Sequence, residues 1–374
     1  MNKTQKILSV VVGLIIVAII SITFSRHTTG EIKISALYPL TGGLAQYGEL
    51  SQKVTDIAVE EINNAGGING QKVTVVYGDH KCDPKEMTTL MEKATNIDKT
   101  NLVMSSACTG TVTAVAPNLQ SKNVLLLSTI LSGRSATGVS KNFFRNYASD
   151  ANESKLLATE IIKAGYKKVA IINEETDYAK GLRLELEKNL ANTGITILSE
   201  SFTTGTTDVR SQLTKIKNFS PDVVFVSPQN VTSGEVVLKQ MEDLNFYPKH
   251  LFVNDNVIKS KDLVAKHRKL MEGAIGGDYI IPTSPAMTDL LAKYKAKYGQ
   301  DCPQPNMCAV VYDSVNLLAE AIKEVGTDTQ KVHEYLSQSE FSGITGNISF
   351  DSQNNRKNAD YALFTIKDGI MIQK

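Results

Sequence analysis

Thr109 is the residue whose type and place in the sequence suggest chemistry most directly. An apolar stretch from Leu102 to Ser105 predicts a buried strand just before it, and Cys108, Thr109 and Gly110 then open a predicted helix. The first N–H groups of a helix lack backbone partners, so they form a ready binding site for an anion. Thr109 can therefore offer its hydroxyl and its backbone N–H together to a carboxylate. The alternative is that Thr109 only caps the helix.

The four cysteines are the second group that could do chemistry. They fall as two plausible pairs by position, Cys82 with Cys108 and Cys302 with Cys308. In a protein outside the cytoplasm such pairs are usually disulfides. A zinc site is disfavoured, because no Cys-x-x-Cys occurs and the five histidines are dispersed along the chain. We therefore predict disulfides and no metal.

The motifs of common enzymes do not appear. Gly43 and Gly48 frame a stretch like a phosphate loop, but Glu49 and Leu50 stand where lysine and a hydroxyl residue would be needed. The first predicted strand-to-helix turn lacks the dinucleotide-binding glycine pattern, and no Gly-x-Ser-x-Gly elbow occurs. We expect neither catalysis nor a cofactor.

Length and charge limit the class of protein. A chain of 374 residues exceeds what one hydrophobic core usually fills, which favours two lobes with a cleft between them. The 40 lysines and arginines are scattered among 39 acidic residues, and the net charge is +1. Without a basic block or an aromatic stacking pattern, nucleic acid is not an expected partner.

The amino terminus carries a membrane signal. An uncharged apolar run begins at Ile7 and ends at Phe24, with Lys3 and Lys6 before it. Its length is close to the thickness of a bilayer's hydrocarbon core, and no clear cleavage site follows. We favour an uncleaved signal anchor over a removed signal peptide for residues 1–30. The lysines would stay inside, which places the rest of the chain outside the cytoplasm.

The elements that must position these residues alternate between strand and helix. From Glu31 onward, short apolar runs alternate with stretches whose apolar residues recur at helical spacing. This pattern predicts an α/β fold with parallel sheets. A second run begins after Ala148, and long helices follow Gly276 and Gly277. We predict an N-terminal apolar helix and then two lobes, which are residues 31–149 plus 277–362 and residues 150–276 plus 363–374.

Five sequence stretches, in this order and spacing, resemble one known family. They are "ISALYPLTGGLAQYGE", "INNAGGINGQKV", "DHKCDP", "SSACTGTVTAVAP" and "VAIINEETDYAKGL". The chain resembles the periplasmic leucine/isoleucine/valine-binding proteins of branched-chain amino acid ABC transporters. The resemblance implies two Rossmann-like lobes joined by three hinge crossings, the type I periplasmic binding protein fold. It also implies a disulfide between Cys82 and Cys108, but it implies nothing about Cys302 and Cys308.

The resemblance further implies a ligand site between the lobes. A serine stands at the position of Thr109 in the family and contacts the ligand carboxylate, and an acid at the position of Asp255 holds the ligand ammonium. In the family that acid is often glutamate, so the shorter aspartate is a departure. The other implied contacts come from both lobes: Leu131, Ser132, Tyr178 and Tyr47.

The function that the resemblance implies is solute capture. We expect the lobes to close around a small amino acid, with leucine, isoleucine or valine leading, and to present it to an ABC transporter permease in the membrane. Polar residues from Ser227 to Asn230, where the family places a tyrosine, leave a polar amino acid, an amide or a peptide-like solute open. The alternative function is a ligand sensor of the same fold that signals to a membrane partner.

Overall fold

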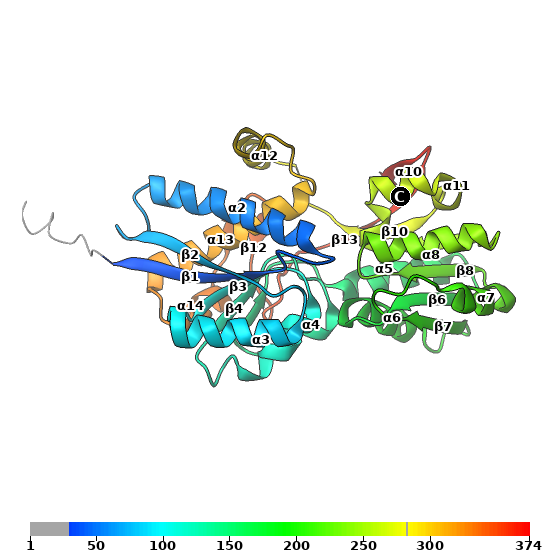
Figure 1. Cartoon of the computed structure of the whole chain (residues 1–374), viewed down its shortest axis with the longest axis horizontal. Helices are drawn as coiled ribbons and strands as arrows, with labels where there is room; N and C mark the ends of the chain where they lie inside the picture. Colours follow the sequence, from blue (N-terminus) through cyan, green and yellow to red (C-terminus); the bar gives the residue numbers. More distant parts are fainter. Residues whose placement is uncertain (1–29, 282) are drawn as a thin grey trace, which may run out of the picture.

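The protein consists of two α/β lobes that lie side by side along the long axis of the molecule (Figure 1). The structure, a computed structural model, describes residues 30–281 and 283–374. The apolar run from Ile7 to Phe24 lies outside these residues, so its role as an anchor stays a prediction. Within the described ranges no helix is both long enough and apolar enough to cross a membrane.

The first lobe is built on a five-stranded parallel sheet in the order β2-β1-β3-β4-β5. Its central strands are runs of apolar residues buried on both faces, as expected for a parallel sheet covered by helices on each side. The strands are β1 (Glu31–Tyr38), β2 (Lys72–Asp79), β3 (Leu102–Ser105), β4 (Leu125–Ser128) and β5 (Phe143–Arg145).

Helices cover both faces of this sheet. Side chains of α2 and α13 pack on one face, and side chains of α3 and α4 pack on the other. The helices are α2 (Ala45–Asn64), α3 (Pro84–Lys93), the π-helix η1 (Ala94–Asp98), α4 (Thr109–Val115), the short 3-10 turns η2 (Ala116–Asn118) and η3 (Arg134–Ala136), α12 (Pro285–Tyr298), α13 (Pro305–Val325) and α14 (Thr329–Gln338). A two-stranded ribbon, β11 (Phe341–Gly343) with β12 (Gly346–Ile348), packs against α13.

The second lobe is built on a seven-stranded sheet in the order β14-β13-β10-β9-β8-β6-β7. Five strands are parallel, and β13 and β14 add an antiparallel edge. The strands are β6 (Lys168–Glu174), β7 (Thr196–Phe202), β8 (Val223–Ser227), β9 (His250–Val253), β10 (Ile275–Tyr279), β13 (Tyr361–Lys367) and β14 (Ile370–Gln373). The helices are α5 (Asp150–Lys163), α6 (Asp177–Leu190), α7 (Arg210–Phe219), α8 (Val231–Asp243), α9 (Asp255–Ile258), α10 (Lys261–Lys266) and α11 (Arg268–Met271). The predicted α/β architecture with parallel sheets is thus present.

The chain passes between the two sheets three times, after β5, after β10 and after β12. A row of three tyrosine rings lies where the connections meet the second lobe: Tyr147 is on the first connection, Tyr279 ends β10 and Tyr361 begins β13. The ring of Tyr147 lies edge-on to that of Tyr279, with centroids 5.1 Å apart, and Tyr279 lies 6.4 Å from Tyr361. Strand β10 continues to Tyr279 in the second sheet, so this element runs past the predicted lobe limit at residue 276. The lobe ranges as a whole stay a prediction.

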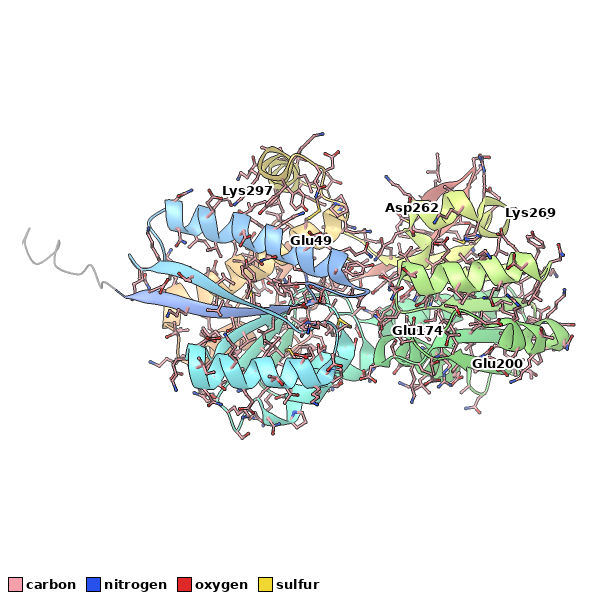
Figure 2. All side chains as sticks on the ribbon, viewed as in Figure 1. Glu49, Glu174, Glu200, Asp262, Lys269 and Lys297 are labelled. Carbon is pink, nitrogen blue, oxygen red and sulfur yellow. A yellow bond between two sulfur atoms is a disulfide. The ribbon has the colours of Figure 1, made fainter. Side chains whose placement is uncertain are left out.

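Two local features of the first lobe follow from residue types. Asp83 caps α3, since its Oδ1 accepts from the backbone N–H of Lys85 at 2.7 Å and from that of Glu86 at 2.9 Å. Both predicted cysteine pairs are disulfides, Cys82 with Cys108 and Cys302 with Cys308. Charged side chains of both signs surround both lobes, with Glu49 and Lys297 on the first lobe and Asp262 and Lys269 on the second (Figure 2).

Candidate functional site

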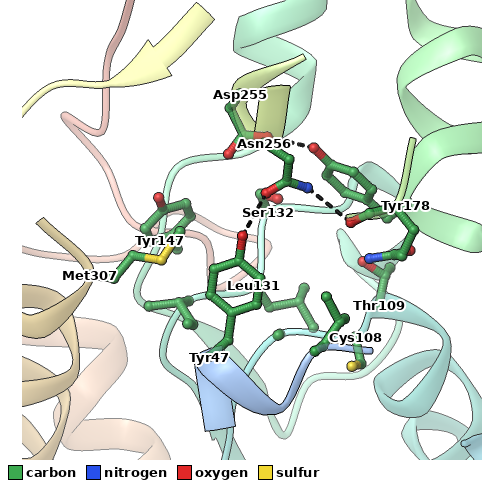
Figure 3. A pocket seen from close by; sticks show the side chains of 14 residues that line it. Tyr47, Cys108, Thr109, Leu131, Ser132, Tyr147, Tyr178, Asp255, Asn256 and Met307 are labelled. Carbon is green, nitrogen blue, oxygen red and sulfur yellow. Dashed lines mark hydrogen bonds between the residues drawn. The ribbon is translucent and has the colours of Figure 1, made fainter. Parts of the chain in front are cut away.

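A small pocket lies where the two lobes meet (Figure 3). Its volume is about 40 Å³. All six residues that the sequence analysis assigned to a ligand site line it: Tyr47, Thr109, Leu131, Ser132, Tyr178 and Asp255. The structure therefore brings together side chains that lie up to two hundred residues apart in the sequence. The remaining lining residues are Leu44, Ala107, Cys108, Ile130, Tyr147, Gln229, Asn256 and Met307.

Thr109 is the first residue of α4, at the end of the pocket formed by the first lobe. The residue before it, Cys108, has a left-handed backbone (φ 52°) and contributes no side-chain capping bond. The disulfide from Cys108 to Cys82 fixes this turn. Cys108, and not Thr109, thus occupies the N-cap of α4. The N–H of Thr111 donates to the Cys108 carbonyl oxygen at 3.0 Å, so the hydroxyl and backbone N–H of Thr109 are the groups that Thr109 can offer to an anion.

The loop after β4 brings Leu131 and Ser132 against Thr109. Gly133 permits this approach, because a Cβ at that position would lie 2.0 Å from Thr109 Oγ1. A real Cβ never comes so near another heavy atom, so only glycine allows both segments to keep their places. Thr109 and Ser132 thus both line the pocket from the first lobe.

Arg145, which is fully buried, holds the same loop from behind. Its Nη1 donates to the carbonyl oxygens of Ser132 and Gly133, at 3.0 and 2.9 Å. Its Nη2 donates to Thr137 Oγ1 at 2.7 Å and to Asn355 Oδ1 at 2.6 Å. Burial lowers the pKa of Arg145 to about 10, which leaves the guanidinium charged at neutral pH. This charged side chain ties the loop to Thr137, which precedes β5, and to Asn355 on the third connection.

Asp255 faces the pocket from the second lobe, at the start of α9. Its Oδ1 accepts from the hydroxyl of Tyr178 at 2.5 Å, and its Oδ2 accepts from Lys259 Nζ at 2.8 Å. Burial alone would lower the pKa of Lys259, but the carboxylates of Asp255 and Asp278 outweigh it and raise that pKa well above the ordinary value. Each carboxylate oxygen still has capacity for a further donor, so Asp255 can also accept from an ammonium.

Tyr47 links the two lobes across the pocket. Its hydroxyl donates to Asn256 Oδ1 at 3.0 Å, and Asn256 Nδ2 donates to the carbonyl oxygen of Gln229 at 3.0 Å. Tyr47 and Asn256 are 6% and 8% exposed. Of the polar stretch from Ser227 to Asn230, only Gln229 lines the pocket, so the rest of that stretch is not part of the pocket wall.

Two further acids are buried behind the pocket at the start of α5. Asp150 Oδ1 accepts from the hydroxyl of Tyr361 at 3.3 Å, while Asp150 Oδ2 and both carboxyl oxygens of Glu153 have no hydrogen-bond partner. Burial, followed by the charge of Asp255, raises the pKa of Asp150 to about 7 and raises that of Glu153 well above its usual value. Protonation removes the cost of burying these carboxylates.

The sequence analysis missed several lining residues. Asn256 could have been found from its place next to Asp255, and Tyr147 from its place in the first connection between lobes. Leu44, Ile130 and Met307 give no sequence signal that separates a pocket wall from ordinary core. Among the residues that the structure describes, no group of three or more metal-ligating side chains is present.

A pocket between two doubly wound lobes, with hydroxyls on one side and an acid on the other, defines a bilobed binding protein. The comparison with known families agrees: a model of the periplasmic binding protein family matches residues 31–370. The chain belongs to this family.

Named relatives extend the likeness over nearly the whole chain. The leucine-, isoleucine-, valine-, threonine-, and alanine-binding protein of Pseudomonas aeruginosa is 26% identical over 367 residues, which is 96% of each chain. The branched-chain amino acid transporter substrate-binding protein LivJ of Streptococcus pneumoniae, solved with isoleucine, is 25% identical with a TM-score of 0.76 and covers 92% of this chain and 100% of its own. The leucine-binding protein LivK of Thermotoga maritima shares the fold at 22% identity, with a TM-score of 0.80 and coverage of 92% and 97%.

Proposed function

We propose that this protein is the extracytoplasmic solute-binding component of an ABC importer, and that it binds an amino acid in the pocket between its lobes. Leucine, isoleucine and valine are the foremost ligands. The observation that carries the proposal is that Thr109 and Ser132 of one lobe face Asp255 of the other across a single pocket. A zwitterion needs donors for its carboxylate and an acceptor for its ammonium. The first lobe supplies the donors, and the second lobe supplies the acceptor.

The apolar part of the wall supports an aliphatic side chain. Leu44, Ile130 and Met307 come from the first lobe and surround the space between the polar ends. Burying an aliphatic side chain there contributes about 0.8 kcal/mol for each CH₂ group. Gln229 is the polar residue on this wall, and it keeps an amide or a polar side chain as the second choice of ligand.

Hinge motion between the lobes is part of the proposal. The space of about 40 Å³ is too small to admit a free amino acid past side chains as buried as Tyr47 and Asn256. Entry therefore requires the lobes to separate, and closure then brings Tyr178 and Asp255 over the solute. The closed form is what a permease would recognise, and the predicted anchor before residue 30 would keep the protein beside it. The protein performs no chemistry on its ligand.

A thermal-shift screen tests the ligand. The full chain is screened against the twenty amino acids, small amides and sugars. A ligand at a hundred times its dissociation constant adds about 2.7 kcal/mol to the free energy of unfolding, which raises the melting temperature measurably. We expect the largest shift with leucine, isoleucine or valine. A shift with a sugar alone would contradict the amino-acid assignment, and no shift with any compound would contradict solute binding.

A further inference from the structure

A short disulfide loop lies between the ligand pocket and the second connection. Cys302 and Cys308 are six residues apart, and the loop between them leads into the first turn of α13. The resemblance to amino-acid-binding proteins did not account for this bond. The loop's residues line a wider interlobe cleft beside the pocket, and Met307 lines both spaces.

Met307 lies beside Tyr147 in the pocket wall (Figure 3). It is 6% exposed, and the neighbouring Cys308 is fully buried. Tyr147 in turn packs edge-on against Tyr279, the last residue of β10. Met307 of the disulfide loop and Tyr147 of the first connection therefore belong to the same pocket wall as Leu44 and Ile130.

The loop also contacts the second connection directly. Asn306 Nδ2 donates to the carbonyl oxygen of Tyr279 at 3.2 Å. Asn306 of the loop is thus bonded to Tyr279, the middle ring of the tyrosine row. Met307, the next residue along the chain, lies beside Tyr147 of the same row. A displacement of this loop would move the pocket wall and its support together.

The disulfide constrains this turn together with Pro305, which stands at the first helical position of α13. Gln304 occupies the N-cap of α13 but makes no side-chain capping bond, although its carbonyl oxygen accepts from Cys308 N–H at 3.0 Å. An uncapped first turn is prone to fray, because its N–H groups lack partners. The disulfide joins Cys302, ahead of the helix, to Cys308 in its first turn. It therefore restricts the backbone that carries Met307.

We propose that Cys302 and Cys308 are positioning residues of the ligand pocket, whose disulfide holds Met307 as the specificity-determining wall for the solute's side chain. The inference rests on the proposed amino-acid binding. It concerns the side chain of the amino acid. The proposed contact of the ligand carboxylate with Thr109, beside the other disulfide, does not depend on it.

The test compares two solutes on matched variants of the full chain. Dissociation constants for leucine and alanine are measured by calorimetry on the unmodified protein, on Cys302→Ala/Cys308→Ala and on Met307→Ala. Leucine reaches the Met307 wall and alanine does not. We therefore expect both variants to lose affinity for leucine at least fivefold more than for alanine. Met287→Ala is the control, since Met287 is buried in the same core cluster but does not line the pocket.

The outcomes separate the possible causes. Met287→Ala should lower the melting temperature and leave the leucine-to-alanine ratio unchanged, so a general loss of stability cannot imitate the expected result. A ratio that stays within twofold of the unmodified protein in the double cysteine variant would overturn the proposal. If that variant does not fold, an unchanged ratio in both Met307→Ala and Asn306→Ala would overturn it equally. Failure of the unmodified protein to bind either solute would instead refute the proposed function.

Discussion

At the scale of single residues, Asp255 is the side chain whose surroundings differ most from the expectation. The sequence and the family resemblance place it at the ligand ammonium, but they do not reveal that Lys259 and Tyr178 already bind its two oxygens. The partner Lys259 lies four residues further on, a spacing that brings side chains together on a helix. That spacing could have predicted the ion pair. The burial of Asp255 and Lys259 depends on how the second lobe folds around them, and no local sequence pattern predicts it.

Thr109 gives the most direct residue-scale prediction. Thr109→Ala should weaken amino-acid binding by an order of magnitude or more, because it removes a charge-assisted hydrogen bond worth about 1.5 to 3 kcal/mol. Isothermal calorimetry on the folded variant measures the change. Thr109→Ser keeps the hydroxyl and should retain most of the affinity. Equal affinities for the alanine and serine variants would remove the Thr109 hydroxyl from the site.

Asp150 predicts how stability depends on pH. Its pKa is raised from an ordinary 3.8 to about 7, first by burial and then by Asp255. Between these values the folded protein holds a proton that the unfolded chain has lost. The free energy of unfolding should therefore fall as the pH rises through this window. Asp150→Asn removes the titration and should reduce this fall in urea-unfolding measurements.

Asp222→Asn serves as the control for that experiment. The backbone N–H groups of Lys167 and Lys168 lower the pKa of Asp222, so its titration lies below the window and its stabilising effect is lost only as the pH falls further. The variant should leave the slope between about pH 4 and about pH 7 unchanged. An identical slope for Asp150→Asn and the unmodified protein would show that Asp150 does not hold the proton.

At the scale of elements, the parts with a strong local signal were predictable. The cap at Asp83 and short buried strands such as β3 follow from residue types alone. The strands β13 and β14 were not predicted, since Ile370 and Ile372 are exposed and the alternation that marks a half-buried strand is weak there. The pairing of β13 with β10 depends on a connection that returns from the other lobe, which is tertiary information.

The loop after β4 yields the prediction for this scale. Gly133→Ala should displace the Thr109 side chain, because the added methyl carbon would lie 2.0 Å from its Oγ1. The backbone of Gly133 itself (φ −51°) accepts alanine without strain, so the fold should persist. We expect a loss of affinity comparable to that of Thr109→Ala, measured by calorimetry. A variant that binds normally would show that the two segments can separate without cost.

At the scale of the whole molecule, the lobes also touch beside the pocket, through residues that do not line it. Thr113 Oγ1 of α4 donates to Asp177 Oδ2 of α6 at 3.0 Å, and neither residue lines the pocket. The sequence could not predict this contact, because it depends on how the two lobes sit against each other. Asp177 is the first residue of α6, whereas Thr113 lies inside α4.

This contact predicts an effect on kinetics. Thr113→Val keeps the shape of the side chain and removes the hydrogen bond. The closed form should therefore be destabilised by about 0.5 to 1.5 kcal/mol. This difference corresponds to a roughly two- to tenfold faster release of the ligand. Stopped-flow measurements of release and association separate the two rates. Release should quicken while association stays nearly constant, because the contact forms only on closure. A change confined to association would contradict its role in the closed form.

The tyrosine row at the connections makes the protein its own optical reporter. The chain contains no tryptophan, so its ultraviolet emission comes from its 13 tyrosines. Tyr147, Tyr279 and Tyr361 lie at the ends of the connections, and Tyr47 and Tyr178 donate hydrogen bonds across or beside the pocket. Separation of the lobes would break the hydrogen bond from Tyr47 to Asn256 and so change the surroundings of that ring. Domain motion in this protein should therefore be visible without any attached dye.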